Sequence, residues 1–184
     1  HLGTDKPSLL EEVLDETMRR GWQGRVCLGH VTSLSSLPPV RLSKMVSRMN
    51  EAGVAVLALP ASDVYMMARS DTHDVRRGVC PVHLLKRQGL CAAFATNNVK
   101  NLFTFTGDGD VLKVGTLLSQ ILQLGTPADH CDCLEMATSD AARSIGVEHR
   151  LDVGARADIV LLDCSTATDA LAAPPVARTV IKGG

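Results

Sequence analysis

The chain has 184 residues, a formal net charge of -1, 45% hydrophobic residues and only 3% aromatic residues. These values are typical of a globular domain, and they argue against nucleic acid as a partner because positive charge and stacking side chains are scarce. No apolar run approaches the roughly 20 residues that a membrane-spanning helix needs. We therefore expect a cytoplasmic protein without a membrane or nucleic-acid partner, and its six cysteines as reduced thiols.

Short apolar runs alternate with stretches of helical periodicity along the chain. Ser8 stands three residues before Glu11, the spacing of a capping box, and apolar residues then recur at helical spacing as far as Gly21. The spacing predicts further helices over 38–52, 81–88, 111–124, 127–137 and 140–145. Buried strands are predicted over 25–30, 54–59 and 90–95. Long loops are expected over 61–79 and 96–109.

This alternation predicts βαβ units and therefore a parallel sheet of the α/β class. A further strand is expected to end at His1. The end of the chain differs, because a turn at Gly154 leads into a strand that ends near 163, and a second strand follows over 176–182. We accordingly divide the chain into an α/β part over 1–150 and a small β element over 151–184.

Polar side chains at the ends of the predicted strands are the first candidates for chemistry. In a parallel barrel, reactive groups sit at the carboxyl ends of the strands. His1 and His30 end two strands, Asp63 follows the third, and Asn97 and Asn98 follow the fourth. Two imidazoles at neighbouring strand ends could bind zinc or iron, and such a metal would generate hydroxide for attack on a C–N bond.

Each candidate also has a structural interpretation. A strand-end histidine is commonly a hydrogen-bonded structural residue, and asparagines commonly bond their own backbone in turns. In the loop over 61–79, Asp71, Arg76 and Arg77 could contact a substrate or could form a set of salt bridges within the loop. The residues alone leave these alternatives open.

Several separated segments resemble one known family. GRVCLGHVTSL at 24–34, VAVLALPASDVYMMARSDTHDVRRGVCPVHLLKRQG at 54–89 and AAFATNNVKNLFTFTGDGDVL at 92–112 occur in the order found in cytosine deaminase and related amidohydrolases. GARADIVLLD at 154–163 is similar to the strand that returns to the small β-sandwich of that superfamily. The resemblance covers nearly the whole chain and extends to a divergent subfamily with the NN loop.

The resemblance implies a (β/α)8 barrel with a small β-sandwich, of which this chain would be the C-terminal half, strands 5 to 8. It also implies hydrolysis of C–N bonds with one divalent metal, zinc or iron. By position, His1 resembles the metal ligand of strand 5 and His30 the strand-6 histidine. The remaining candidates, Asp63, Asn98, Asp71 and Arg77, would contact the substrate.

Two positions depart from the family pattern. Thr4 stands where the proton-shuttling glutamate is expected, and it cannot act as a general acid or base near neutral pH. Asn97 stands where the family has a ligand aspartate, and a neutral amide binds a hard cation more weakly than a carboxylate does. We therefore expect a weakened metal site.

A half barrel should expose parallel strand edges that are normally covered. We expect a partner in the form of an N-terminal barrel half or another subunit, together with a small-molecule substrate. Two functions stay open at this point. The first is a metal-dependent hydrolase of a small cyclic nitrogen compound in which His30 and Asn97 are catalytic. The second is a non-catalytic barrel that binds a small ligand or a partner.

Overall fold

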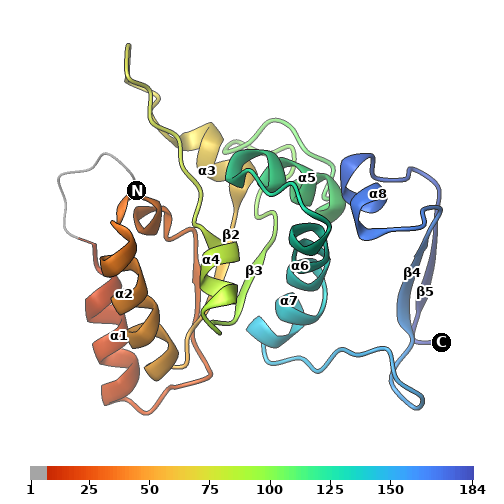
Figure 1. Ribbon diagram of the computed structural model, residues 1–184, viewed down its shortest axis with the longest axis horizontal. Coiled ribbons are helices and arrows are strands. Elements are labelled where there is room, and N and C mark those ends of the chain that lie inside the picture. The colour runs from red at the N-terminus through yellow and green to blue at the C-terminus, as the bar shows by residue number, and fades with distance from the viewer. Residues whose placement is uncertain (1–7) are drawn as a thin grey trace.

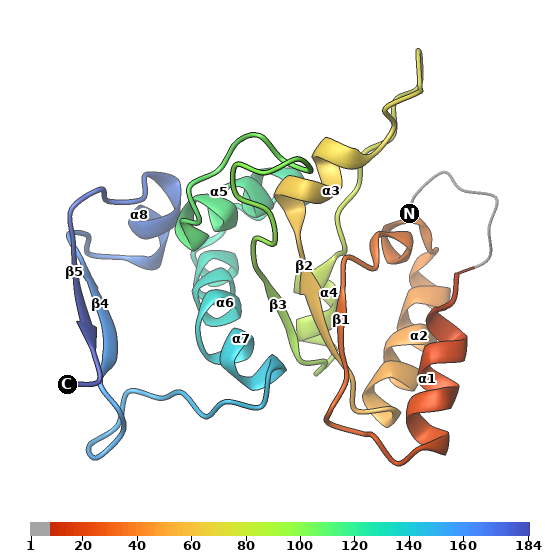
Figure 2. The ribbon, with the colours of Figure 1, turned by 180° about the vertical axis from the view of Figure 1, so that it is seen from behind.

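A parallel sheet runs through the middle of the protein, whose computed structural model describes residues 8–184. Its strands lie in chain order in the sheet and are β1 (Cys27–Gly29), β2 (Ala55–Ala58) and β3 (Ala92–Phe94) (Figures 1 and 2). The three strands predicted over 25–30, 54–59 and 90–95 are therefore confirmed, and so is their parallel arrangement. The expected strand that ends at His1 lies outside the described residues.

Two helices, α1 (Leu10–Arg19) and α2 (Pro39–Glu51), lie side by side next to β1 and run in the same direction in both views (Figures 1 and 2). The Ser8 hydroxyl accepts a hydrogen bond from the first backbone N–H of α1, which satisfies one of its unpaired amide groups. Arg48 of α2 lies 2.6 Å from a Glu11 carboxylate oxygen of α1. The first helix therefore begins close to the predicted cap at Ser8, but Leu9 is its N-cap and Glu11 pairs with Arg48 instead of completing a capping box. This surface ion pair joins the two helices.

The remaining helices of this part follow the strands. They are the 3₁₀ helix Thr32–Ser36, α3 (Pro60–Met66), α4 (Val82–Arg87), α5 (Val111–Leu122), α6 (Pro127–Ala137) and α7 (Ser139–Ser144). Their apolar side chains join Val56 and Phe94 of the sheet in one buried core. Within residues 8–184, no helix combines the length and apolar character that crossing a membrane requires.

Helix α3 corrects the expected loop over 61–79. Pro60 has a fixed φ that suits the first helical position, and its missing N–H costs nothing there. We had treated Pro60 only as the end of a strand, so the helix over 60–66 was missed. Of the irregular segment that remains, 67–81, the exposed residues 69–77 project away from the sheet (Figure 1), whereas Val79 and Cys80 are buried in the core.

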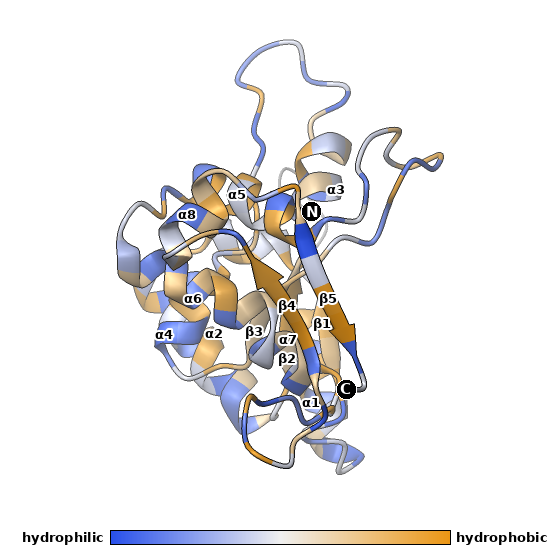
Figure 3. Cartoon of the chain, turned by 90° about the vertical axis from the view of Figure 1, so that its right-hand side faces the viewer, coloured by the Kyte–Doolittle hydropathy of each residue, from blue (hydrophilic) through white to orange (hydrophobic). Residues whose placement is uncertain are grey.

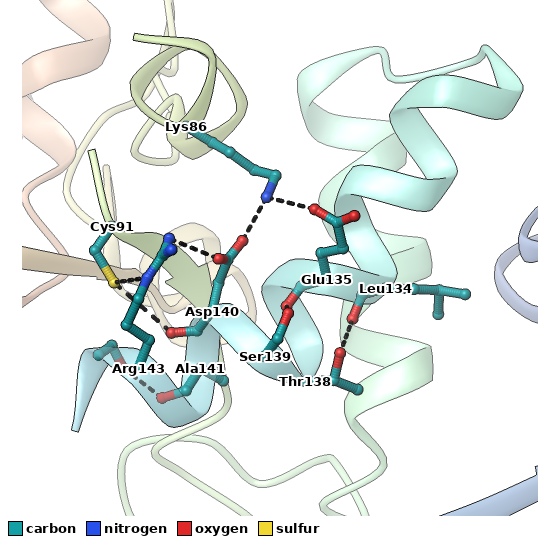
Figure 4. A network of polar contacts seen from close by, with 10 residues as sticks. Lys86, Cys91, Leu134, Glu135, Thr138, Ser139, Asp140, Ala141 and Arg143 are labelled. Carbon is teal, nitrogen blue, oxygen red and sulfur yellow. Dashed lines mark hydrogen bonds and ion pairs between the residues drawn. The ribbon is translucent and has the colours of Figure 1, made fainter. Parts of the chain in front are cut away.

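A polar network ties α4, α6 and α7 together (Figure 4). Lys86 of α4 lies 2.8 Å from a Glu135 carboxylate oxygen and 2.6 Å from an Asp140 carboxylate oxygen. Arg143 donates to Asp140 at 2.8 Å and to the Cys91 sulfur at 3.5 Å. Asp140 is buried, so removing either cation would leave its charge less compensated.

The end of the chain forms a separate two-stranded antiparallel hairpin. Strand β4 (Asp158–Leu162) pairs with β5 (Arg178–Lys182), and α8 (Ala167–Ala172) lies in the connection between them. Both predicted strands are confirmed, whereas α8 was not expected. Apolar residues of both strands are exposed, among them Val160 and Val180 (Figure 3). Whether the hairpin belongs to a small β-sandwich stays a prediction, as does the domain boundary at 150.

Candidate active site

Four polar side chains meet at the carboxyl ends of the parallel strands. His30 follows β1, Ser62 and Asp63 lie in α3 directly after β2, and Asn97 follows β3. We call these four residues the His30 cluster. It contains three residues predicted from the sequence, His30, Asp63 and Asn97, and adds Ser62, which we had not singled out.

Asp63 holds the imidazole of His30 from behind. Asp63 Oδ1 lies 2.6 Å from His30 Nδ1, and the Asp63 side chain is 0% exposed. Burial raises the pKa of the Asp63 carboxyl, and the hydrogen bond from His30 offsets part of that rise. A carboxyl oxygen on Nδ1 favours the tautomer with its proton at that nitrogen, which leaves the lone pair of Nε2 facing the other way. We had expected Asp63 to contact a substrate, but its described partner is His30.

Asn97 lies on the opposite side of the imidazole. Its Nδ2 is 3.4 Å from His30 Nε2, the length of a weak hydrogen bond to the lone pair of that nitrogen. The Ser62 hydroxyl donates to Asn97 Oδ1 at 2.8 Å. Two consecutive residues of α3 therefore orient the two polar groups that follow β1 and β3.

The backbone at His30 is strained. His30 and Val31 have φ values of 70° and 43°, both in the left-handed region. This region is uncommon for residues other than glycine and is an outlier for a β-branched valine, with a cost of about 1–3 kcal/mol each. His30 N–H still donates to Leu57 O at 3.0 Å, so the strand pairing continues up to the strained pair. Such strain clusters at functional sites, because the surrounding contacts must hold the residue in place.

The described residues do not by themselves fit a divalent metal. Among residues 8–184, no group of three or more His, Cys, Asp or Glu side chains is arranged to hold one. Asn97 turns its NH₂ group toward His30, and an amide NH₂ cannot bind a cation. Asp63 Oδ2 is buried and has no hydrogen-bond partner within the described part of the chain. The predicted ligand His1 and the altered position Thr4 lie outside the described residues.

The other predicted substrate residues are not part of the His30 cluster. Asn98 accepts a hydrogen bond from Asn101 at 2.8 Å and lines a cavity of about 530 Å³ beside the start of α5. Asp71 and Arg77 are exposed on the projecting stretch 69–77 (Figure 1). Sequence position alone could not reveal this, because the path of a long loop is not set by periodicity.

Ser62 was missed because serine after a predicted strand carries little information. Its neighbour Asp63 was noticed as a charged residue near a strand end, whereas the intervening helix was not predicted. With Pro60 recognised as the first residue of a helix, the positions two and three residues later would have pointed to the same strand end.

Comparisons with known proteins agree with this fold. The family model described as "Amidohydrolase family" matches residues 3–184. A pterin deaminase from Rhizobium rhizogenes is 29% identical over 178 residues, which are 95% of this chain and 40% of that protein.

Two solved structures are also similar. One is 5-methylcytosine deaminase from Klebsiella pneumoniae, with a TM-score of 0.88, 24% identity and coverage of 98% of this chain and 44% of that one. The other is N-isopropylammelide isopropylaminohydrolase from Burkholderia multivorans, with a TM-score of 0.81, 28% identity and coverage of 95% and 42%. The chain therefore spans less than half the length of the relatives it matches.

Proposed function

Because this chain belongs to the amidohydrolase family, and within it resembles the cytosine-deaminase-like members, we propose that it acts in the hydrolysis of a C–N bond in a small cyclic nitrogen compound. The observation that carries the proposal is the His30 cluster at the carboxyl ends of the strands, where barrel enzymes hold their reactive groups. The pterin deaminase relative supports an amino-substituted nitrogen ring as the substrate. Such relatives favour an enzyme over the non-catalytic alternative.

His30 is the proposed proton carrier. Its Nε2 lone pair can accept a proton from water while the water oxygen forms a bond to the ring carbon. Asp63, bound to Nδ1 at 2.6 Å, keeps the ring oriented and stabilises the positive charge that develops on it. His30 then returns the proton to the leaving nitrogen as the C–N bond breaks, which releases ammonia or an amine.

Asn97 is proposed to bind the reacting part of the substrate. Its amide places the donor end, Nδ2, next to His30 Nε2, while the acceptor end, Oδ1, is bonded to Ser62. Cyclic amides and amidines present acceptor atoms that match this donor. Asn98, Asp71 and Arg77 stay proposed substrate contacts farther from the His30 cluster. Asp71 and Arg77 belong to the exposed stretch 69–77, so they remain accessible to a substrate that binds outside the His30 cluster.

A divalent metal bound by His1 and His30 stays a prediction for the whole protein. The described donors do not complete such a site, so no step above depends on a metal. The proposed partner, an N-terminal barrel half or another subunit, would have to supply further ligands and would pack against the exposed strand β1. A cytoplasmic location likewise stays part of the proposal.

Release of ammonia or amine by the purified protein tests the proposal. Pterin, 5-methylcytosine and N-isopropylammelide are incubated with the protein, with and without added zinc or ferrous iron. We expect turnover of at least one ring, and a loss of about 100-fold or more for His30→Gln, since it removes the proton carrier. The matched control His73→Gln changes an exposed histidine and should keep full activity. Full activity of His30→Gln would overturn the mechanism, and binding without turnover would favour the non-catalytic alternative.

A further inference from the structure

The Ser62 hydroxyl has two acceptors and one proton. Ser62 Oγ lies 2.8 Å from Asn97 Oδ1 and 3.2 Å from Leu59 O, and the Ser62 side chain is buried. A hydroxyl can donate only one hydrogen bond at a time, and its oxygen can also accept. The proton must therefore go either to the Asn97 amide or to the backbone carbonyl of Leu59.

Asn97 has the matching property, because its amide carries a donor at one end and an acceptor at the other. In the described orientation, Ser62 donates to Oδ1 and Nδ2 faces His30 Nε2 at 3.4 Å. Turning the amide by 180° about its last bond exchanges the two ends. Nδ2 then donates to Ser62 Oγ, the Ser62 proton turns to Leu59 O, and Oδ1 faces the space beside His30.

The Leu59 carbonyl, the Ser62 hydroxyl and the end of the Asn97 amide next to Ser62 are hydrogen-bonded in both orientations. Only the end of the amide that faces the site changes its surroundings. The end at the site is also the weakest contact, since 3.4 Å is long for an N–H···N bond. An alanine at 62 could satisfy neither orientation of the amide. An aspartate at 97 would have no donor end, so reversal requires Asn97 as well as Ser62.

We infer that Ser62 is a positioning residue that lets the Asn97 amide turn its oxygen into the site when a ligand with an N–H donor binds. This inference rests on the proposed function, and it specifies the substrate class as rings that carry an N–H next to the carbon under attack. The ligand N–H bonds to Asn97 Oδ1, and the rotation of the Ser62 hydroxyl keeps the far end of the amide paired. The site would therefore prefer cyclic amides and amidines with a free ring N–H over their N-methylated forms.

The side-chain NH₂ signals of Asn97 in a ¹⁵N–¹H spectrum test this directly and require no turnover. The signals are assigned by their absence in Asn97→Asp. We expect two well-separated proton shifts in the free protein that change on saturation with pterin. In Ser62→Ala the free-state shifts should move toward the values of an exposed amide, whereas Ser62→Thr, which keeps the hydroxyl, should retain the original pattern.

Kinetics supply the second measurement for whichever ring is turned over. Ser62→Ala should raise KM about fivefold and change kcat by less than about twofold, because the lost hydrogen bond acts on binding. Ser47→Ala is the matched control, since its hydroxyl only donates to the carbonyl of Ser43 four residues earlier on α2. If Ser62→Ala is poorly folded, the Asn97 NH₂ signals and the KM of Ser62→Thr are compared with those of the original protein, and both should be unchanged.

Unchanged Asn97 signals in a folded Ser62→Ala variant, or altered signals in folded Ser62→Thr, would overturn the inference. So would a fall in kcat at constant KM. Absence of turnover for every ring would remove the proposed function but not the hydroxyl–amide coupling, which the spectra of the free protein report separately.

Discussion

The two outer strands of the sheet differ sharply although both are short, parallel and paired to β2. All three residues of β3 are buried, whereas Cys27 and Gly29 of β1 are exposed and only Leu28 between them is partly buried. Strand β3 is covered by helices that follow it in the chain, and α6 and α7 both contact it. Among residues 8–184, nothing comparable covers the outer edge of β1. We had expected 25–30 to be buried, so this exposure corrects that prediction.

The difference teaches that strand patterning and strand burial have separate causes. Apolar residues determine that 25–30 forms a strand, but its covering comes from other parts of a structure. The His30 cluster combines residues that follow the two outer strands. His30 follows the exposed strand β1, and Asn97 follows the buried strand β3. The described contacts at the strained backbone include the Asp63 hydrogen bond to the imidazole, the His30 N–H bond to Leu57 of β2, and the packing of Val31 against the core.

The largest expected contrast is between truncations in the two outer strands. Phe94→Ala removes a side chain that is 1% exposed and should lower the free energy of unfolding by about 3–5 kcal/mol. Leu28→Ala on β1 should cost only about 1 kcal/mol, because part of its surface is already exposed to water. Urea unfolding followed by circular dichroism measures both. Equal losses would show that β1 is as firmly packed as β3.

A smaller effect is expected where α5 packs against both β3 and α8. A methyl group added at Gly115 would lie 2.8 Å from Leu171 Cδ2 and 3.1 Å from Phe94 Cζ. Gly115→Ala should therefore destabilise the protein by about 1–2 kcal/mol despite the better helix propensity of alanine. The same thermal or urea unfolding curve should hardly move for Gly125→Ala, where a methyl group meets nothing within 4 Å. A stabilised Gly115→Ala variant would mean that α8 packs less closely than described.

Much of the fold could be predicted because its signals are local. Helix 127–137 was predicted with the bounds that the structure has, since Pro127 at the first position and the capping residue Thr126 mark its beginning. The first hairpin strand was predicted from the turn at Gly154 and the residues that follow it, and the second was predicted over 176–182. Helix α8 was missed although the equally short α4 and α7 were predicted, because the capping residue Thr166 at its beginning was not recognised.

The candidate site was predictable only in part. His30 and Asn97 could be predicted to lie close together because each follows a predicted strand, and parallel strands place their carboxyl ends at the same edge of the sheet. The partner of each imidazole nitrogen depends on side-chain directions, which residue spacing does not specify. Asp63 was therefore expected at a substrate and lies behind His30 instead. Ser62 was overlooked for the same reason.

The smallest predicted effect concerns the ion pair between the hairpin and the beginning of α5, the helix that packs near β3. Arg178 of β5 donates to both carboxylate oxygens of Asp110, which also caps α5, at 2.8 and 2.7 Å. This hydrogen bond lowers the pKa of Asp110 below its ordinary value of 3.8. The folded state consequently binds a proton at Asp110 less readily than the unfolded state does. The stabilisation is therefore complete above pH 3.8 and is lost as the pH falls through the lowered pKa.

Asp110→Asn should thus cost about 1 kcal/mol at pH 7 and less at pH 2, because asparagine still caps the helix but carries no charge. Unfolding free energies measured by urea at both pH values test this. Asp15→Asn is the control, since it removes an exposed carboxylate paired with Arg48 on the side of β1 and should change stability by only a few tenths of a kcal/mol. A larger loss for Asp15→Asn would reverse the comparison, because the exposed side of the sheet would then depend more on its ion pairs than the buried side does.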